Sequence, residues 1–125
     1  MIYDLIIINA AAITVNPNFD IIPRAMVAIS DGKIARVGPM PAQEALPPAV
    51  EELDAAGHIL MPGLVNAHTH LPMVLFRGLA DDLPLQEWLN AHMFPVESRW
   101  ITPDTVGPAA RLACADMLLS GTTTC

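Results

Sequence analysis

The stretch PGLVNAHTH, residues 62–70, decides the fold of this chain. It ends an apolar run with two histidines, His68 and His70, that are two positions apart. Side chains of a β-strand alternate between its two faces, so residues two positions apart share a face. The stretch therefore predicts a buried strand over residues 64–70 that presents two imidazoles side by side, the arrangement needed to hold a transition metal.

Two histidines at this spacing also fit a plainer interpretation, in which both imidazoles are solvated or hydrogen-bonded within the protein. As metal ligands, neutral imidazoles suit zinc, which acts as a Lewis acid and lowers the pKa of a bound water to about 7. A catalytic zinc site needs more than two protein ligands. The remaining ligands must then come from elsewhere in the protein.

The composition is unusual for a chain of 125 residues, because 53% of the residues are hydrophobic and only 15% are charged. Strands that are buried on both faces, as in parallel barrels, give such a composition. A segment whose apolar surface packs against a missing remainder gives it too. We expect both reasons to apply, and the chain to be the N-terminal portion of a longer protein.

Charge and cysteine content narrow the classes of partner. A formal net charge of −7 argues against nucleic acid or an anionic membrane surface. Asp4 precedes the first apolar run without a positive segment before it, so a secretory signal is not expected. Residues 59–76 lack Asp, Glu, Lys and Arg, but prolines and histidines within them exclude a membrane span. The two cysteines, Cys114 and Cys125, have no metal or redox spacing, which favours a reduced, cytoplasmic protein.

Residues 1–60 have the pattern of β structure. Apolar runs rich in β-branched residues cover 3–8, 13–15, 25–29 and 34–37. Asp31-Gly32 stands between the last two runs and predicts a two-residue type I′ hairpin, whose central residues need positive φ.

Residues 61–125 have the pattern of a βαβ unit. After the strand over 64–70, a long connection over 71–100 contains a short predicted helix at 85–91 that ends before Pro95. Thr102 and Pro103 predict the start of the next helix, and Gly121 its end. The helix has an apolar stripe at three- to four-residue spacing: Val106, Ala110, Ala113, Met117 and Leu118. A second strand begins at Thr122.

Together with DAAG at residues 54–57, the stretch at 62–70 resembles the first barrel strand of the amidohydrolase superfamily. The connection LPMVLFRGLADDL at 71–83, followed by EWL at 87–89 and PVE at 95–97, is similar to the aminohydrolase branch. The resemblance implies an α/β fold. Residues 1–60 would belong to a small β-sandwich domain, and residues 61–125 would form the first βαβ unit of an incomplete (β/α)8 TIM barrel.

The resemblance also implies an activity, namely metal-dependent hydrolytic deamination of adenosine-type substrates. Such substrates are 5-methylthioadenosine and S-adenosylhomocysteine, which give the inosine analogue and ammonia. His68 and His70 would bind a divalent metal, zinc or alternatively iron. Glu97 would bind the ribose hydroxyls, since a carboxylate can accept two hydrogen bonds from a cis-diol; a solvated glutamate is the plainer interpretation.

No catalytic acid or base of the family falls within these residues. Two further histidines, a proton-shuttling glutamate and a late aspartate lie beyond Cys125 in such enzymes. We therefore expect residues 1–125 alone to bind metal weakly and to be inactive. The expected partner is a purine nucleoside, and relatives are often homo-oligomers.

Three other functions remain open. Within the same branch, a triazine chlorohydrolase or another heterocycle deaminase has a similar first strand. A binuclear dihydroorotase- or hydantoinase-type enzyme also begins with His-x-His. From another class, the chain could be a non-catalytic binding module or pseudoenzyme.

The sequence predicts structural roles for several other side chains. Trp88 and Cys114 are expected to be packing residues, with Cys114 buried. His58 is treated as structural and His92 as a surface residue of the connection. Arg77 and Gly78 are expected to shape the connection. Pairing of Arg77 with Asp81 or Asp82 is an alternative, and these two acids could also form a solvated turn.

Overall fold

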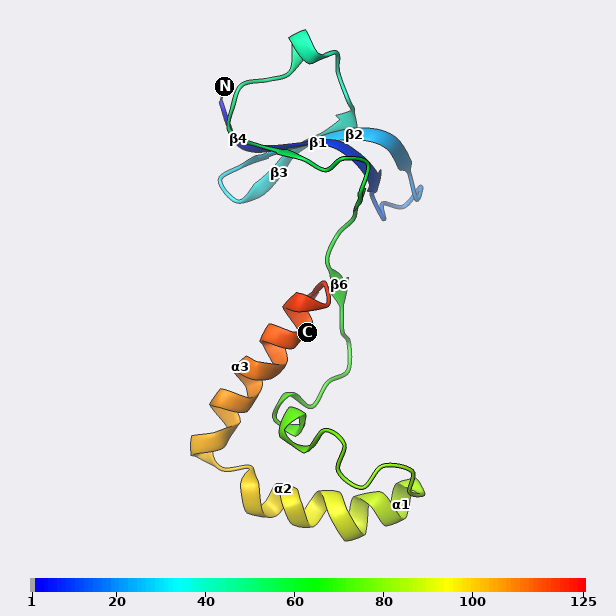
Figure 1. The fold of residues 1–125 in the computed structure, drawn as a ribbon, viewed down its shortest axis with the longest axis vertical. Helices are drawn as coiled ribbons and strands as arrows, with labels where there is room; N and C mark the ends of the chain where they lie inside the picture. Colours follow the sequence, from blue (N-terminus) through cyan, green and yellow to red (C-terminus); the bar gives the residue numbers. More distant parts are fainter. Residues whose placement is uncertain (1) are drawn as a thin grey trace. The chain divides into compact units, whose positions relative to one another are not determined.

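A computed structural model describes residues 2–125, which form two compact units divided between Pro62 and Gly63. The first unit consists mainly of strands, and the second is largely helical with one pair of short strands (Figure 1). The predicted mixed α/β class is confirmed. The assignment of residues 1–60 to a sandwich domain and of 61–125 to a barrel stays a prediction.

The first unit is a five-stranded sheet. Its strands are β1 (Tyr3–Ile13), β2 (Ile21–Ser30), β3 (Lys33–Pro39), β4 (Ala49–Asp54) and β5 (Ile59–Leu60). The order is β3-β2-β1-β4, and β5 also pairs with β1. The pairs β1–β2 and β2–β3 are antiparallel, whereas β4 and β5 run parallel to β1. A short 3₁₀ turn, η1 (Gln43–Ala45), lies in the connection to β4.

The hairpin between β2 and β3 turns at Asp31 and Gly32, whose φ angles are 52° and 68°. Ser30 pairs with Lys33 across the turn. The predicted two-residue hairpin is therefore confirmed. The Asp4 carboxylate accepts the backbone N–H of Asp31 at 2.6 Å, which fastens the turn to β1.

A bulge at Asn9 joins two apolar runs into the single strand β1. The φ of Asn9 is 55°, a conformation that asparagine tolerates better than most residues. The pairing of β1 with β2 shifts register between Ile7 and Ala10. An extra residue moves the following side chains to the opposite face, so Ile7 before the bulge and Ala12 after it line the same cavity.

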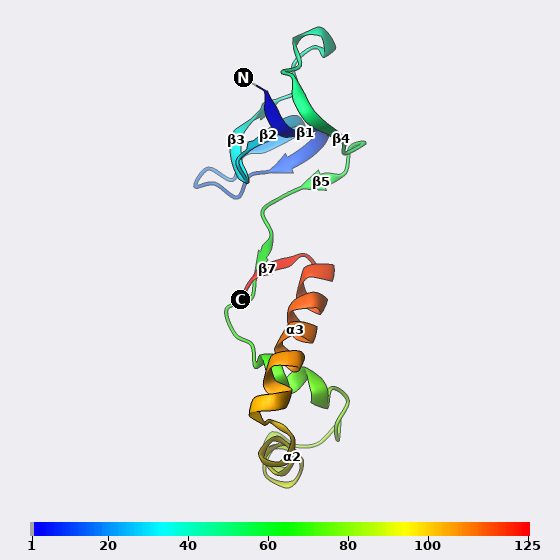
Figure 2. The ribbon, with the colours of Figure 1, turned by 90° about the vertical axis from the view of Figure 1, so that its left-hand side faces the viewer.

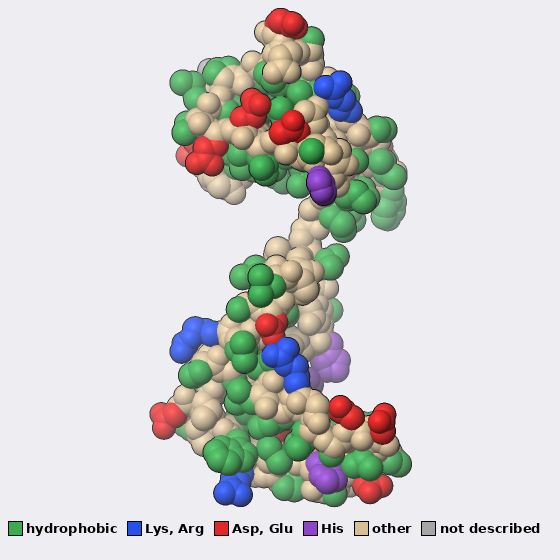
Figure 3. Space-filling model, viewed as in Figure 1, with side chains coloured by type: hydrophobic (Ala, Val, Ile, Leu, Met, Phe, Trp, Pro, Cys, Tyr) green, Lys and Arg blue, Asp and Glu red, His purple; other side chains and the backbone are tan. Residues whose placement is uncertain are grey.

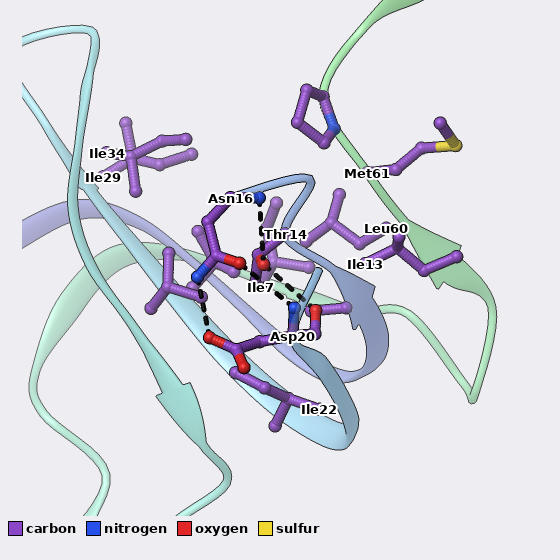
Figure 4. A pocket seen from close by; sticks show the side chains of 14 residues that line it. Ile7, Ile13, Thr14, Asn16, Asp20, Ile22, Ile29, Ile34, Leu60 and Met61 are labelled. Atoms are coloured by element: carbon purple, nitrogen blue, oxygen red, sulfur yellow. Dashed lines mark hydrogen bonds between the residues drawn. The ribbon is translucent and has the colours of Figure 1, made fainter. Parts of the chain in front are cut away.

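The two faces of the sheet are covered differently. One face carries a buried cluster of Ile6, Ile8, Met26 and Ala28, against which Leu46 packs. The other face opens into an apolar cavity of about 470 Å³ (Figure 4). Its one polar corner is made by Thr14, Asn16 and Asp20, which hydrogen-bond to one another. The rest of the lining is apolar: Ile7, Ala12, Ile13, Ile22, Val27, Ile29, Ile34, Val37, Leu60, Met61 and Pro62.

Asp54 at the end of β4 ties the sheet to the segment that leads into β5. Its Oδ1 accepts the backbone N–H of Ala56 at 2.8 Å and the side-chain amide of Asn9 at 3.1 Å. These two hydrogen bonds, the Ala56 one first, hold the pKa of Asp54 below its usual 3.8, and the charge of Arg24 acts in the same direction.

This lowered pKa predicts a pH-dependent stability difference. A carboxyl whose pKa is lower in the folded state stabilises the protein above its unfolded pKa and loses that effect as pH falls. Asp54→Ala should therefore lower the urea midpoint of unfolding at pH 7, and the difference from wild type should shrink below pH 3.8. Glu51→Ala, on the same strand and exposed, is the control. A difference that does not change with pH would contradict this prediction.

The second unit begins with β6 (Leu64–Val65) and ends with β7 (Thr122–Thr124), and the two strands pair in parallel. Between them lie the 3₁₀ segment η2 (Leu71–Phe76) and the helices α1 (Leu85–Glu87), η3 (Trp88–Met93), α2 (Phe94–Trp100) and α3 (Pro103–Leu119). Figure 2 shows α3 leading directly into β7. The predicted order of strand, long connection, helix and strand is confirmed.

The helix α3 starts and ends as its sequence predicts. Thr102 is the N-cap: its hydroxyl accepts the N–H of Thr105 at 3.3 Å, and its own N–H donates to Thr105 Oγ1 at 2.9 Å. Pro103 follows at the first helical position. Gly121 lies just past the helix with a φ of 85°, and its N–H donates to Leu118 O at 3.1 Å.

The predicted apolar stripe of α3 is only partly right. Ala109 and Ala113 are the buried residues of the helix, whereas Val106 and Leu118 are exposed. Cys114 is exposed as well, so its predicted burial was wrong. Burial on α3 depends on which residues η2 contacts, and spacing along the helix does not specify that contact. Exposed apolar side chains occur on both units (Figure 3).

The helix predicted over residues 85–91 continues to Trp100 instead of ending before Pro95. Residues Trp88–Met93 form a π-helical turn, in which the N–H of Phe94 donates to Leu89 O, five residues earlier. Pro95 follows in the first turn of α2, and the π-helical turn before it lets the helix continue through a residue that has no N–H to donate. No helix among residues 2–125 is both long and apolar enough to cross a bilayer. The cytoplasmic location stays a prediction.

Gly63 makes room for the strand β7. A Cβ at this position would overlap the side chain of Thr123, with Thr123 Cβ at 2.7 Å and Oγ1 and Cγ2 closer still. Real Cβ atoms do not approach other atoms so closely. The pairing of β6 with β7 therefore requires glycine at residue 63.

Gly63→Ala should lower the free energy of unfolding by about 1–3 kcal/mol, the usual cost of overpacking. Gly38→Ala is the matched control, because a Cβ on Gly38 meets nothing within 4 Å. Urea unfolding of both variants checks the prediction. Equal midpoints would show that β7 does not pack against residue 63.

Candidate metal centre

The candidate site lies where the chain leaves β6. The N–H of Leu64 donates to Gly121 O and the N–H of Asn66 donates to Thr124 O, both at 2.9 Å. These bonds fix the direction of residues 64–66. Beyond them, the chain continues through His68 to His70, which immediately precedes η2.

The two histidines converge. Their Nε2 atoms lie 3.1 Å apart, and their ring centroids lie 5.2 Å apart with the planes tilted by 40°. Both side chains are exposed. At this distance the contact is a hydrogen bond when one Nε2 carries a proton and the other offers its lone pair.

The separation of the two nitrogen atoms matches a shared metal ion. Zn–N bonds of 2.0–2.1 Å at a tetrahedral angle place two imidazole nitrogens roughly 3.3 Å apart. The observed 3.1 Å is close to that value. A cation can therefore replace the bridging proton with little movement of either ring.

The prediction that residues 64–70 form one buried strand was wrong. The strand β6 ends at Val65, and Leu64 and Val65 are 50% and 70% exposed. Within the described residues only β7 pairs with β6, and that pairing ends at Thr124. The histidines share a side without belonging to the strand.

No group of three or more His, Cys, Asp and Glu side chains suited to a metal occurs among residues 2–125. The pair thus offers two nitrogen donors of the three or more that a catalytic zinc site uses. Two donors also leave positions for water or substrate.

Glu97 lies on α2 and is half-buried. Within the described residues, no hydrogen bond or ion pair of its carboxylate is found, and none joins it to His68 or His70. Arg99 does not pair with it, because the Arg99 guanidinium lies over the ring of Trp100, 5.1 Å from the centroid. The carboxylate of Glu97 is therefore available to a ligand.

Arg77 pairs with a residue that the sequence did not suggest. Its Nη1 lies 2.8 Å from Asp116 Oδ2, on α3, and no ion pair joins it to the alternative partners Asp81 and Asp82 in the described part of the chain. This oxygen is itself shielded from solvent. The ion pair joins the end of η2, the segment that follows His70, to the helix that leads into β7.

Asn66 is the other residue near the histidine pair for which the sequence did not predict a role. Its Oδ1 accepts the backbone N–H of His68 at 3.1 Å. An asparagine that bonds the backbone two residues on is a known turn signal. The NxH spacing at residues 66–68 could have indicated it.

Three further predicted structural residues have identifiable contacts or exposures. His58 Nδ1 lies 2.8 Å from Ala55 O, and Trp88 Nε1–H donates to Leu79 O at 3.0 Å. His92 is half-buried. Neither of these two hydrogen bonds involves His68 or His70.

The chain is similar to known proteins over nearly its whole length. A model described as "Amidohydrolase family" matches residues 59–125, more than half of the chain. The chain is 49% identical over 121 residues to the 5-methylthioadenosine/S-adenosylhomocysteine deaminase of Syntrophobacter fumaroxidans, covering 97% of this chain and 27% of that protein. It is 45% identical over 120 residues to the 5'-deoxyadenosine deaminase of Methanosarcina mazei, covering 96% of this chain and 27% of that protein.

Among solved structures, an adenosine deaminase from Xanthomonas campestris with bound zinc is similar, with a TM-score of 0.88 and 42% identity. The match covers 97% of this chain and 28% of that one. The chain thus spans about a quarter of the length of the proteins it matches.

Proposed function

Because the chain belongs to the amidohydrolase family, we propose that its protein is a metal-dependent hydrolytic deaminase of adenosine-type nucleosides. The observation that carries the proposal is the 3.1 Å approach of the His68 and His70 Nε2 atoms within the residues that match the family. The names of its relatives support a nucleoside substrate. We propose 5-methylthioadenosine and S-adenosylhomocysteine as substrates.

His68 and His70 hold one divalent transition metal in this proposal. Zinc is the proposed ion, as in the similar adenosine deaminase structure, and imidazole donors also suit iron. When bound, such a metal activates water for attack on an electron-poor carbon. The two imidazoles supply neutral lone pairs at a fixed spacing, and the remaining ligands and the proton-shuttling acid come from outside residues 1–125.

The proposal is tested with the product of the complete reading frame that encodes these residues. That protein should release ammonia from 5-methylthioadenosine. His68→Ala and His70→Ala should each reduce the rate by more than about 100-fold, because removing a ligand exceeds the 10–100-fold effect of outer contacts. His58→Ala, in the first unit, should leave the rate unchanged.

Two outcomes would contradict the proposal. One is chloride release from chlorotriazines with no ammonia from any nucleoside, which indicates the chlorohydrolase alternative. The other is unchanged ammonia release after loss of either histidine. Residues 1–125 alone should release none, since they offer no third ligand among the described residues.

Glu97 is the proposed ribose ligand. Its unpaired carboxylate can accept hydrogen bonds from both hydroxyls of a cis-diol. Hydrogen bonds to charged groups contribute about 1.5–3 kcal/mol, so Glu97→Gln should reduce kcat/KM for 5-methylthioadenosine by about 10–100-fold.

A substrate without ribose hydroxyls isolates this contact. For the wild-type protein, the 2',3'-dideoxy analogue should be a poorer substrate than 5-methylthioadenosine. The Glu97→Gln variant should turn over this analogue as well as the wild-type protein does. Glu87→Gln, on exposed helix α1, is the control. If both substrates lose rate equally in the Glu97 variant, the carboxylate does not contact the ribose.

A further inference from the structure

Asn66 is the one anchored side chain in an exposed segment. Among residues 61–70, every other side chain is exposed, whereas Asn66 is half-buried. Its backbone N–H belongs to the pairing with β7, through Thr124 O at 2.9 Å. The residue therefore connects the end of a fixed strand to the histidines that follow.

The carboxamide of Asn66 makes two different contacts at once. Its Oδ1 accepts the backbone N–H of His68 at 3.1 Å. Its Nδ2 donates to the Met117 Sδ, on α3, at 3.9 Å. Rotating the amide by 180° would place an NH₂ group against the His68 N–H, so the two contacts together select one orientation.

These contacts define the point from which the His68 side chain leaves the backbone. The separation of the two imidazoles depends on where the two Cα atoms lie, on the backbone of Thr69 between them and on the rotamers of both side chains. Within the described residues, no side chain other than Asn66 bonds the backbone of residues 67–69. Without this bond, the backbone between β6 and η2 would sample many directions.

We propose that Asn66 is a positioning residue for metal binding, which holds the His68 backbone so that the two Nε2 atoms stay one metal site apart. The proposal rests on the proposed function, since it takes His68 and His70 as ligands. In this proposal, Asn66 contacts neither the metal nor the substrate. Contacts of this kind typically change metal affinity by 10–100-fold when removed.

The test measures Co²⁺ affinity by competition with a chelator, in the product of the complete reading frame. Asn66→Ala should weaken Co²⁺ binding by about 10-fold or more. Asn66→Asp keeps an acceptor for the His68 N–H and should bind Co²⁺ at least as tightly as wild type. Thr69→Ala, between the histidines and exposed, is the matched control and should have no effect.

A second measurement needs no metal. Hydrogen exchange at the His68 amide should be slow in wild type and Asn66→Asp, and clearly faster in Asn66→Ala. Met117→Leu keeps the volume but removes the sulfur acceptor, and should change both readouts less than Asn66→Ala because thioether acceptors are weak. Asn66→Asp and Met117→Leu keep the test informative if Asn66→Ala fails to fold.

The outcomes separate the two proposals. If wild type binds Co²⁺ through the histidines and the alanine and aspartate variants match it in affinity and exchange, the positioning role is overturned and the proposed function stands. Equal losses in Asn66→Ala and Asn66→Asp would also overturn it. If His68→Ala and His70→Ala bind Co²⁺ as wild type does, the proposed metal site itself is wrong, and the positioning role with it.

Discussion

The parallel pairing of β6 with β7 determines where the two histidines lie. The strands come from opposite ends of the second unit, and three features bring them together. Gly121 adopts a φ of 85° and turns the chain from α3 directly into β7. Gly63 has no side chain where Thr123 packs. Asn66 then makes the last backbone bond to β7, at Thr124 O, before the chain leaves for His68.

Local signals predicted those parts of the structure that neighbours in sequence determine. The Asp31-Gly32 turn, the Thr102 cap and the end of α3 at Gly121 each depend on residues within one turn. Features set by distant partners were not predictable in the same way. Arg77 pairs with Asp116 on α3 instead of its near neighbours. The helix through Pro95 is possible because of a π-helical turn, which propensities do not indicate.

The prediction that His68 and His70 share a side was correct, but the reason given for it was wrong. Alternation along a buried strand predicted that His68 and His70 share a side, and their Nε2 atoms do lie 3.1 Å apart. The strand itself ends at Val65, so a hydrogen-bonded turn from Asn66, and not strand geometry, brings the rings together. Family membership adds the chemical context. In this proposal, two imidazole nitrogens at the separation of ligands to one metal ion form part of a hydrolytic metal site.

The central claim is that His68 and His70 bind one metal ion together. Anomalous X-ray diffraction at the zinc edge, on crystals of the zinc-loaded product of the complete reading frame, tests it most directly. The account predicts a single peak about 2.0–2.1 Å from both Nε2 atoms. A zinc peak bound by other residues, with the two imidazoles still in hydrogen-bond contact with each other, would contradict it.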